Sequence, residues 1–168
     1  MLAKKFGKCV DDGDVLGALL IAKDLNLNQV YKELDGATPL TYSVLYEAEE
    51  IAVALIDMGA DVTIECVDGG TALHDAASEG CLSIVKPLVE AGADINYQCS
   101  DGLTPLHQAA WWDNLDVASL LVNLGADPTI KDKNGSTPKD LAMERKFSQM
   151  IEFFENLEPP LYFVAKRK

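Results

Sequence analysis

Basic residues are almost missing from the middle of this chain. Between residues 33 and 113 there is one base, Lys86, against 15 acids, so the stretch has a net charge of −14 in a chain whose total is −13. Nucleic-acid binding normally depends on Lys and Arg side chains that neutralise phosphates, so we expect no nucleic-acid partner. A surface of one charge sign attracts partners of the other and speeds their encounter. We therefore expect a partner with a basic surface; the alternative is that many of these acids only form turns.

Long apolar runs are also missing. No run approaches the roughly 18 residues that a membrane span needs. The lysines among residues 1–10 are followed by acids and not by the apolar core of a signal peptide. We therefore expect no membrane association and a cytoplasmic location, with a nuclear location as the alternative. We also expect the protein to be a monomer.

Cysteine is scarce, and its spacing does not favour zinc. The four cysteines contain no Cys-x-x-Cys pair, which structural zinc sites usually need. Cys66 and Cys99 lie 33 residues apart, at equivalent points of the repeat described below. Packed helices lie roughly 8–10 Å apart, whereas a disulfide needs Cα atoms within about 7 Å. We therefore predict no disulfide, no metal site and no cofactor.

What the chain does contain is an internal repeat. The segment DGGTALHDAA at residues 68–77 returns as DGLTPLHQAA at residues 101–110, an offset of 33 residues. The same offset relates GAD at residues 59–61, 92–94 and 125–127, and DGATPL at residues 35–40 corresponds to NGSTP at residues 134–138. A 33-residue period with a T-P-L-H-x-A core is the ankyrin signature. The chain therefore resembles ankyrin-repeat proteins over residues 33–157.

The residues of the repeat also suit helix ends. A threonine stands at the expected N-cap of each first helix: Thr38, Thr71, Thr104 and Thr137. A glycine follows each expected second helix, as a C-cap requires: Gly59, Gly92 and Gly125. We predict an all-α fold, a solenoid of stacked helix-turn-helix units with β-hairpin tips. Its helix pairs should span residues 38–46 and 49–57, 72–79 and 82–90, and 105–112 and 115–123.

One domain is expected over residues 1–158. It comprises a degenerate N-terminal cap (1–32), three full repeats (33–65, 66–98 and 99–131) and a C-terminal cap (132–158). A tail follows at residues 159–168, where four apolar residues precede a basic end. The tail either docks on the cap, since bare apolar runs are unfavourable in water, or serves as a peptide ligand.

His74 and His107 are the only histidines, and each has an acid nearby in sequence. A catalytic role would also need a nucleophile and an orienting group, and no such pattern occurs. No phosphate-binding loop occurs either, because no Gly-Lys-Ser/Thr follows the glycines. The family resemblance instead implies that each imidazole hydrogen-bonds the turn of its own and of the neighbouring repeat. We therefore expect a non-enzymatic protein.

The resemblance also implies a binding surface, because ankyrin proteins generally bind partners through the hairpin tips and the concave face of the first helices. The implied positions are Leu34, Asp35, Tyr42, Leu45 and Tyr46 in the first full repeat, Val67, Asp68, Asp75, Ser78 and Glu79 in the second, and Ser100, Asp101, Leu103, Gln108, Trp111, Trp112 and Asp113 in the third. Consecutive helical residues point about 100° apart, so at least one tryptophan should be accessible. The function expected is that of an adaptor, targeting subunit or inhibitor; the alternative is an enzyme or ligand-binding protein with a pocket between repeats.

Asn96 is a candidate modification site. Ankyrin repeats are substrates of an asparaginyl hydroxylase that favours an Asn preceded by an acid and an aliphatic residue, with Leu eight positions upstream. Leu88, Asp94 and Ile95 meet that pattern, whereas Thr63 and Thr129 stand at the equivalent positions of the flanking repeats. The alternative is that the Asn96 side chain only ties the hairpin backbone.

Overall fold

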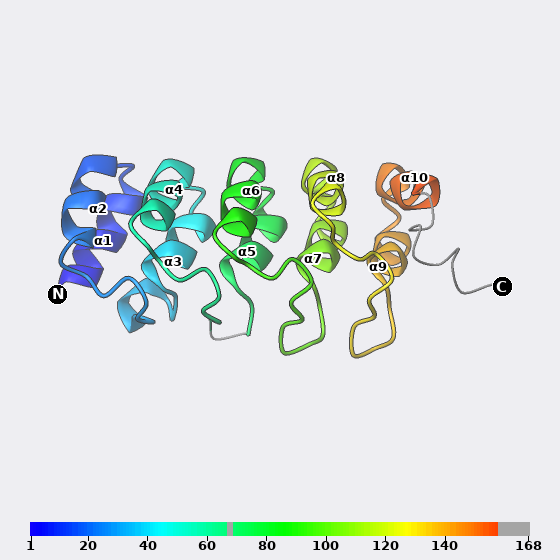
Figure 1. The fold of residues 1–168 in the computed structure, drawn as a ribbon, viewed down its shortest axis with the longest axis horizontal. Coiled ribbons are helices and arrows are strands. Elements are labelled where there is room, and N and C mark those ends of the chain that lie inside the picture. Colours follow the sequence, from blue (N-terminus) through cyan, green and yellow to red (C-terminus); the bar gives the residue numbers. More distant parts are fainter. Residues whose placement is uncertain (67–68, 158–168) are drawn as a thin grey trace.

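The computed structural model describes residues 1–66 and 69–157, and these form a row of helix pairs (Figure 1). The helices are α1 (Leu2–Asp11), α2 (Val15–Ala22), η1 (Lys32–Leu34), α3 (Pro39–Leu45), α4 (Glu49–Asp57), α5 (Ala72–Glu79), α6 (Leu82–Glu90), α7 (Pro105–Trp111), α8 (Leu115–Asn123), α9 (Pro138–Arg145) and α10 (Ser148–Asn156). Within the described residues, the only β-pairing is an isolated bridge between Tyr31 and Ala37. The predicted all-α solenoid and its 33-residue phase are confirmed.

The helices form two layers, with the tips projecting below them in Figure 1. The first helices α1, α3, α5, α7 and α9 pack side by side, and α2, α4, α6, α8 and α10 form the second layer. Backbone hydrogen bonds close the tips: Cys99 N donates to Leu103 O (2.9 Å), and Asp132 N donates to Ser136 O (2.9 Å). The tips are therefore tight turns rather than extended strands.

Threonine begins each first helix from α3 onwards. The N-caps are Thr38, Thr71, Thr104 and Thr137, and proline is the first helical residue in three of the four cases. The Thr104 hydroxyl accepts from the His107 N–H, which satisfies one of the helix's unpaired donors. Such a cap stabilises a helix by about 1 kcal/mol.

Glycine ends the second helices α4, α6 and α8 in a left-handed turn. Gly59, at φ +89°, directly follows Met58, the C-cap of α4, whose backbone is still helical. Its N–H donates to Ile56 O (2.9 Å), and the N–H of Ala60 donates to Leu55 O (3.0 Å). This pair of bonds is a Schellman motif, and its left-handed residue strongly favours glycine. Gly92 and Gly125 repeat the arrangement, as predicted.

Alanines let neighbouring repeats approach closely. Ala76 and Ala77 of α5, and Ala109 and Ala110 of α7, are fully buried between first helices. Larger apolar residues of both layers fill the remaining space, and the buried side chains form one continuous core along the solenoid. Each pair of neighbouring units contributes one small interface to this core.

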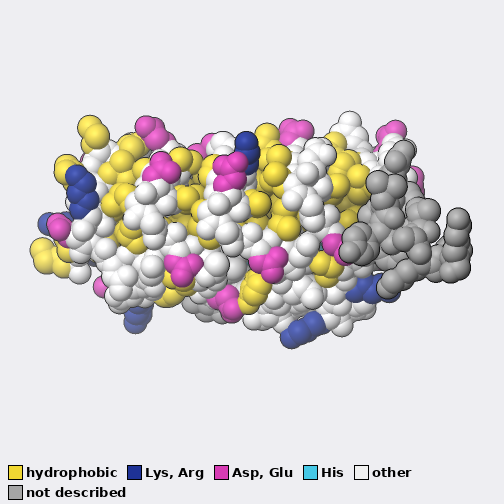
Figure 2. Space-filling view, in the orientation of Figure 1, with side chains coloured by type: hydrophobic (Ala, Val, Ile, Leu, Met, Phe, Trp, Pro, Cys, Tyr) yellow, Lys and Arg dark blue, Asp and Glu magenta, His cyan; other side chains and the backbone are white. Residues whose placement is uncertain are grey.

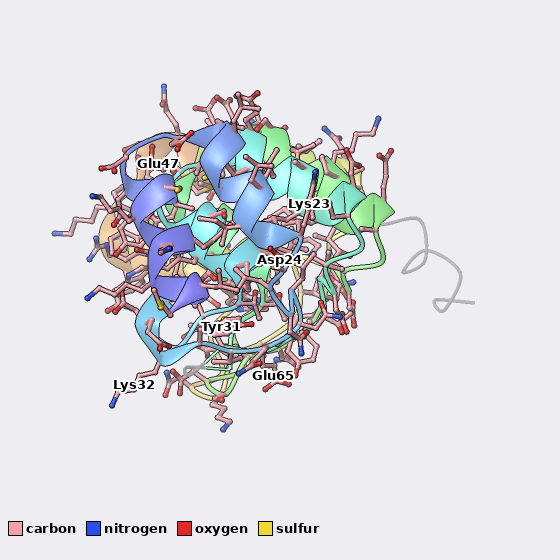
Figure 3. The ribbon with its side chains drawn as sticks, turned by 90° about the vertical axis from the view of Figure 1, so that its left-hand side faces the viewer. Lys23, Asp24, Tyr31, Lys32, Glu47 and Glu65 are labelled. Atoms are coloured by element: carbon pink, nitrogen blue, oxygen red, sulfur yellow. The ribbon has the colours of Figure 1, made fainter. Side chains whose placement is uncertain are left out.

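The N-terminal unit covers one end of the first full repeat. Phe6 of α1 is buried, and Gly7 lies so close to the next unit that a Cβ there would come within 2.9 Å of Leu34 Cδ2. Helix α2, at the end of the solenoid that faces the viewer in Figure 3, exposes Leu16 (77%) and Leu20 (64%). A terminal unit is expected to have a polar outer face, so this apolar end differs from that expectation.

Cys9, Cys81 and Cys99 are free thiols, so Cys99 forms no disulfide with its equivalent Cys66. Across residues 1–66 and 69–157, no group of three or more His, Cys, Asp or Glu residues is arranged to hold a metal ion. None of the helices in this part of the chain is both long enough and apolar enough to cross a membrane.

Candidate functional site

Both histidines connect consecutive repeats. Nδ1 of His107 accepts a hydrogen bond from the Thr104 N–H (3.1 Å), and Nε2 lies 3.1 Å from the carbonyl oxygen of Ser136 in the next tip. His74 makes the same bonds with Thr71 N and Leu103 O. The carbonyl oxygen can only accept, so Nε2 of His107 carries a proton, and since Nδ1 accepts the Thr104 N–H, the His107 ring is neutral. Burial lowers the pKa of His107, which favours this neutral form.

These bonds confirm the role that the family resemblance implied for the histidines. Both ring nitrogens of His107 are occupied by bonds to its own repeat and to the next one. The ring is fully buried. A proton shuttle needs a nitrogen that can reach a substrate, so His107 serves to hold the tips in place.

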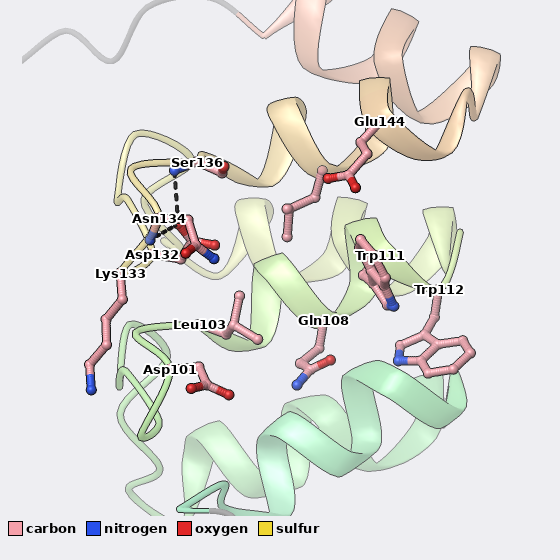
Figure 4. Close-up of a pocket in the computed structure, with 11 residues that line it drawn as sticks. Asp101, Leu103, Gln108, Trp111, Trp112, Asp132, Lys133, Asn134, Ser136 and Glu144 are labelled. Atoms are coloured by element: carbon pink, nitrogen blue, oxygen red, sulfur yellow. Dashed lines mark hydrogen bonds between the residues drawn. The ribbon is translucent and has the colours of Figure 1, made fainter.

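A hollow of about 580 Å³ lies between the third full repeat and the C-terminal cap (Figure 4). We call it the tryptophan hollow. Its lining residues come from the two adjacent tips and from α7 and α9: Asp101, Leu103, Gln108, Trp111, Trp112, Asp132, Lys133, Asn134, Ser136, Leu141 and Glu144. The first helices and the tips together therefore form one concave site, with apolar side chains in its floor and polar ones around it.

The sequence predicted one side of this hollow and missed the other. Asp101, Leu103, Gln108, Trp111 and Trp112 were predicted and lie together in it. The missed residues belong to the cap, at Asp132, Lys133, Asn134, Ser136, Leu141 and Glu144. The 33-residue period itself could have found five of them, because all except Asp132 are the equivalents of predicted positions in the preceding repeat.

The two tryptophans differ in exposure. Trp112, the C-cap of α7, is 54% exposed, which confirms that at least one indole is accessible. Trp111 is half-buried, and the guanidinium of Arg145 lies over its ring, 4.6 Å from the centroid. Arg145 also lies 5.7 Å from the Phe147 ring centroid, so the Trp111 ring is held from the cap side.

The acids of the hollow fall into two groups. Asp132 is buried, and its Oδ1 accepts from the N–H groups of Asn134 (2.9 Å) and Ser136 (2.8 Å), as Figure 4 shows. It therefore serves the tip. Asp101 and Glu144 are exposed, and within the described part of the chain neither carboxylate makes a hydrogen bond or ion pair. These two carboxylates remain available to a ligand.

Two predicted site residues of the first full repeat belong to the core instead, so the prediction is wrong for them. Leu34 is fully buried under α1, and Tyr42 is 5% exposed. The Tyr42 hydroxyl donates to Asp11 Oδ1 (2.9 Å); burial and then this bond raise the pKa of Tyr42. Gly7 gives both side chains the space to insert. Asp35, Leu45 and Tyr46 are exposed, as predicted.

The remaining predicted residues are spread along the solenoid. Val67 and Asp68 lie outside the described residues. Asp75 and Ser78 are half-buried, and the Ser78 carbonyl accepts from the Asn114 side chain (2.7 Å). The other three are exposed: Glu79, Ser100 and Asp113. They do not line the tryptophan hollow.

Several acids of the central repeats are turn residues. This agrees with the alternative explanation of the negative charge, in which many of the acids only form turns. Asp61 accepts from the N–H (2.9 Å) and the hydroxyl (2.7 Å) of Thr63, and these bonds lower the pKa of Asp61. Asp94 accepts from Asn96 N in the same way (2.9 Å). Other acids are spread over the surface, where basic groups are few (Figure 2). The negative surface therefore consists of fewer available carboxylates than the composition indicates.

Asn96 ties two units together. Its side-chain Oδ1 accepts from the N–H of Asp127 in the next repeat (2.8 Å), and the residue is half-buried. This agrees with a backbone-tying role and extends it across the repeat boundary. Hydroxylation of Asn96 stays a prediction.

Stacked 33-residue helix pairs with projecting tips define a repeat solenoid of the kind that builds extended binding surfaces. The family model described as ankyrin repeats (3 copies) matches residues 6–99 and 65–132, which together exceed half of the chain. The chain belongs to the ankyrin-repeat family, whose members are generally protein-protein interaction modules. No match was found among curated proteins.

Proposed function

We propose that this chain is an adaptor, targeting subunit or inhibitor that binds a partner protein on the tips and first helices that form the tryptophan hollow, in the third full repeat and the cap. The observation that carries the proposal is the exposed indole of Trp112, at 54%, beside the hollow of about 580 Å³. Exposed tryptophans of this kind are frequent hot spots, because they bury a large apolar area when a partner binds.

The surroundings of Trp112 support this function. Leu103 is half-buried and supplies apolar contact area, while Gln108 and Asn134 supply amide groups that can pair with a partner's backbone. Protein interfaces commonly combine an apolar centre with a polar rim. The groove therefore has the composition of an interface.

Charge supports a basic partner. Asp101 and Glu144 line the hollow, and two further acids nearby are exposed: Glu79 at the end of α5 and Asp113 in the turn after α7. Lys133 is the single base among the residues that line the hollow. A partner with a basic surface would be attracted before contact, and the attraction would weaken with salt, because screening shortens to about 8 Å at physiological ionic strength.

A small-molecule role is the second candidate, because about 580 Å³ falls within the range of roughly 300–1,000 Å³ typical of ligand pockets. An enzyme would additionally need convergent acid-base groups aimed at one reacting atom. The hollow is open to solvent rather than closed, which favours a peptide or protein surface.

An affinity pull-down from cell lysate tests the proposal, with proteins quantified by mass spectrometry. The test variant is Trp111→Ala/Trp112→Ala, and the control is Tyr46→Ala, which removes an aromatic of similar exposure (49%) from the equivalent position of the first full repeat. We expect the double variant to lose a defined set of proteins that wild type and the control retain. Identical sets from all three would contradict the proposal.

The electrostatic part has its own test once a partner is recovered. Replacing Glu79 and Asp113 with Lys should lower the association rate more than it raises the dissociation rate, and raised salt should do the same to wild type. If neither change alters the association rate, the proposal that the partner has a basic surface fails, while the proposed contact with the tryptophans stands.

A further inference from the structure

We infer that the tryptophan hollow recognises an arginine side chain in an extended segment of the partner protein. The inference rests on the proposed function and specifies the chemistry of its ligand. Three features of the described residues carry it: an open indole, two available carboxylates, and a guanidinium already bound to the adjacent indole.

The adjacent indole shows how the site holds a guanidinium. Arg145 of the cap stacks over the ring of Trp111, 4.6 Å from its centroid, and so occupies one side of the tryptophan pair. The neighbouring ring of Trp112 is 54% exposed, and no ring or cation contact to it occurs within residues 1–66 and 69–157. Trp112 therefore offers a second indole face, on which the guanidinium of a ligand can stack.

The carboxylates supply the charge that selects a cation. Glu144 projects from α9 toward α7, and Asp101 lies at the adjacent tip, both facing the same hollow (Figure 4). Asp132 is used within its own tip, and Lys133 pairs with neither exposed carboxylate. A cation that enters the hollow thus meets the Glu144 carboxylate on the side of the tryptophans and the Asp101 carboxylate toward the tip (Figure 4).

Geometry favours arginine over lysine. A planar guanidinium can stack on an indole and still direct its N–H groups to a carboxylate, whereas an ammonium is a compact and strongly hydrated charge. Leu103, which is half-buried, provides apolar surface for the methylene stem and for a neighbouring aliphatic side chain. The ligand is therefore a segment in which an arginine stands beside an apolar residue.

A peptide-display selection on the full chain tests this assignment. A random peptide library is selected for binding to wild type and depleted on the Trp112→Ala variant, so the recovered peptides require the open indole. Recovered peptides are then resynthesised with each arginine replaced by lysine or by uncharged citrulline. The two tryptophans of the chain both line the hollow, so their fluorescence reports binding at that site.

We expect the recovered peptides to share an arginine, and we expect its replacement by lysine to weaken binding about five- to tenfold. Glu144→Gln should weaken binding by a similar factor, whereas Glu152→Gln, an exposed acid of α10 outside the hollow, should not. Thermal unfolding of each variant confirms that the fold is kept.

Two outcomes overturn the inference, and they are distinguishable. If peptides require Trp112 but bind equally well with lysine, or contain no arginine, the arginine assignment fails while the binding groove stands. If no peptide requires Trp112, the inference and the proposed position of the binding site fail together.

Discussion

The first and third full repeats place the same positions of the repeat in opposite environments. Tyr42 and Gln108 stand two periods apart, yet Tyr42 is buried and Gln108 lines the tryptophan hollow. Leu34 is buried, while its equivalent Ser100 is exposed. Position in the repeat therefore does not decide exposure; the preceding and following units do.

The difference has a local cause on each side. In the first full repeat, α1 packs onto Leu34 because Gly7 has no side chain, and Asp11 accepts the Tyr42 hydroxyl. In the third repeat, Ser100 and Gln108 occupy these two positions, and the cap adds Glu144 and Leu141 to the wall of the tryptophan hollow. The first repeat is thus covered by a neighbouring unit of the chain, whereas the third leaves its side of the tryptophan hollow accessible.

A second difference concerns the bonds between repeats. Thr41 stands where His74 and His107 stand in the later repeats, and its hydroxyl lies 2.9 Å from that of Thr38 in the same repeat. The two histidines instead reach the next tip. The His bridges therefore link the second repeat to the third and the third to the cap.

Leu34→Ala should produce the largest effect on stability. Removing a fully buried leucine typically costs about 2–5 kcal/mol of unfolding free energy, because a cavity remains. Trp112→Ala should cost less than about 0.5 kcal/mol, since the ring is half exposed. Partner binding should show the reverse order, with Trp112→Ala the more damaging. Urea unfolding and a binding titration on both variants check this; a stable Leu34→Ala variant that no longer binds would restore Leu34 to the binding surface.

His107→Ala should follow, at about 2–4 kcal/mol. The change leaves the buried Thr104 N–H and the Ser136 carbonyl without their partner, and such groups are costly. Thr41→Val, the matched change in the first full repeat, should cost about 1 kcal/mol, because it removes one hydrogen bond. Chemical unfolding followed by circular dichroism measures both. Equal losses would show that the His bridge adds nothing to repeat coupling.

His107 of the third full repeat and Tyr42 of the first should lower the stability of the fold at opposite ends of the pH scale. Burial lowers the pKa of His107 below its usual value of about 6.5, so the unfolded chain binds a proton before the native one does. Stability should then fall as pH drops below about 6.5, by at most about 1.4 kcal/mol per pH unit. Burial raises the pKa of Tyr42 above its usual value of about 10, so the unfolded chain loses its proton first and stability should fall as pH rises above about 10.

Two variants separate these contributions from other titrating groups. His107→Gln should flatten the acid side of the profile and leave the alkaline side unchanged, and Tyr42→Phe should do the opposite. Burial also raises the pKa of Cys81, to about 11, so the alkaline comparison is made between wild type and Tyr42→Phe. Profiles that both substitutions leave unaltered would show that neither group is coupled to folding.

The helices could be predicted from the sequence because every full repeat carries a threonine at the N-cap of its first helix and a glycine after its second. The pair expected at residues 105–112 and 115–123, for example, is found at Pro105–Trp111 and Leu115–Asn123, between a threonine N-cap and a left-handed glycine. Capping and turn formation are local, so short motifs determine them.

Contacts between units were harder to predict. Burial of Leu34 depends on Gly7, which is 27 residues away and carries no repeat signature. The repeat motif assigns residues 132–158 to a terminal cap, and it therefore does not predict that Glu144 and Leu141 line the tryptophan hollow. Both errors arise where a terminal unit meets a full repeat, since the motif describes one unit and not its neighbours.

Covalent footprinting of the protein with a recovered partner tests the central claim most directly. Tyr46 and Trp112 occupy equivalent positions and have similar exposures of 49% and 54%, so they form an internal pair for comparison. Hydroxyl-radical labelling of the complex, read by mass spectrometry, should fall several-fold at Trp112 and stay unchanged at Tyr46. Protection of Tyr46 with Trp112 still reactive would contradict the account, because the partner would then lie on the first full repeat and not in the tryptophan hollow.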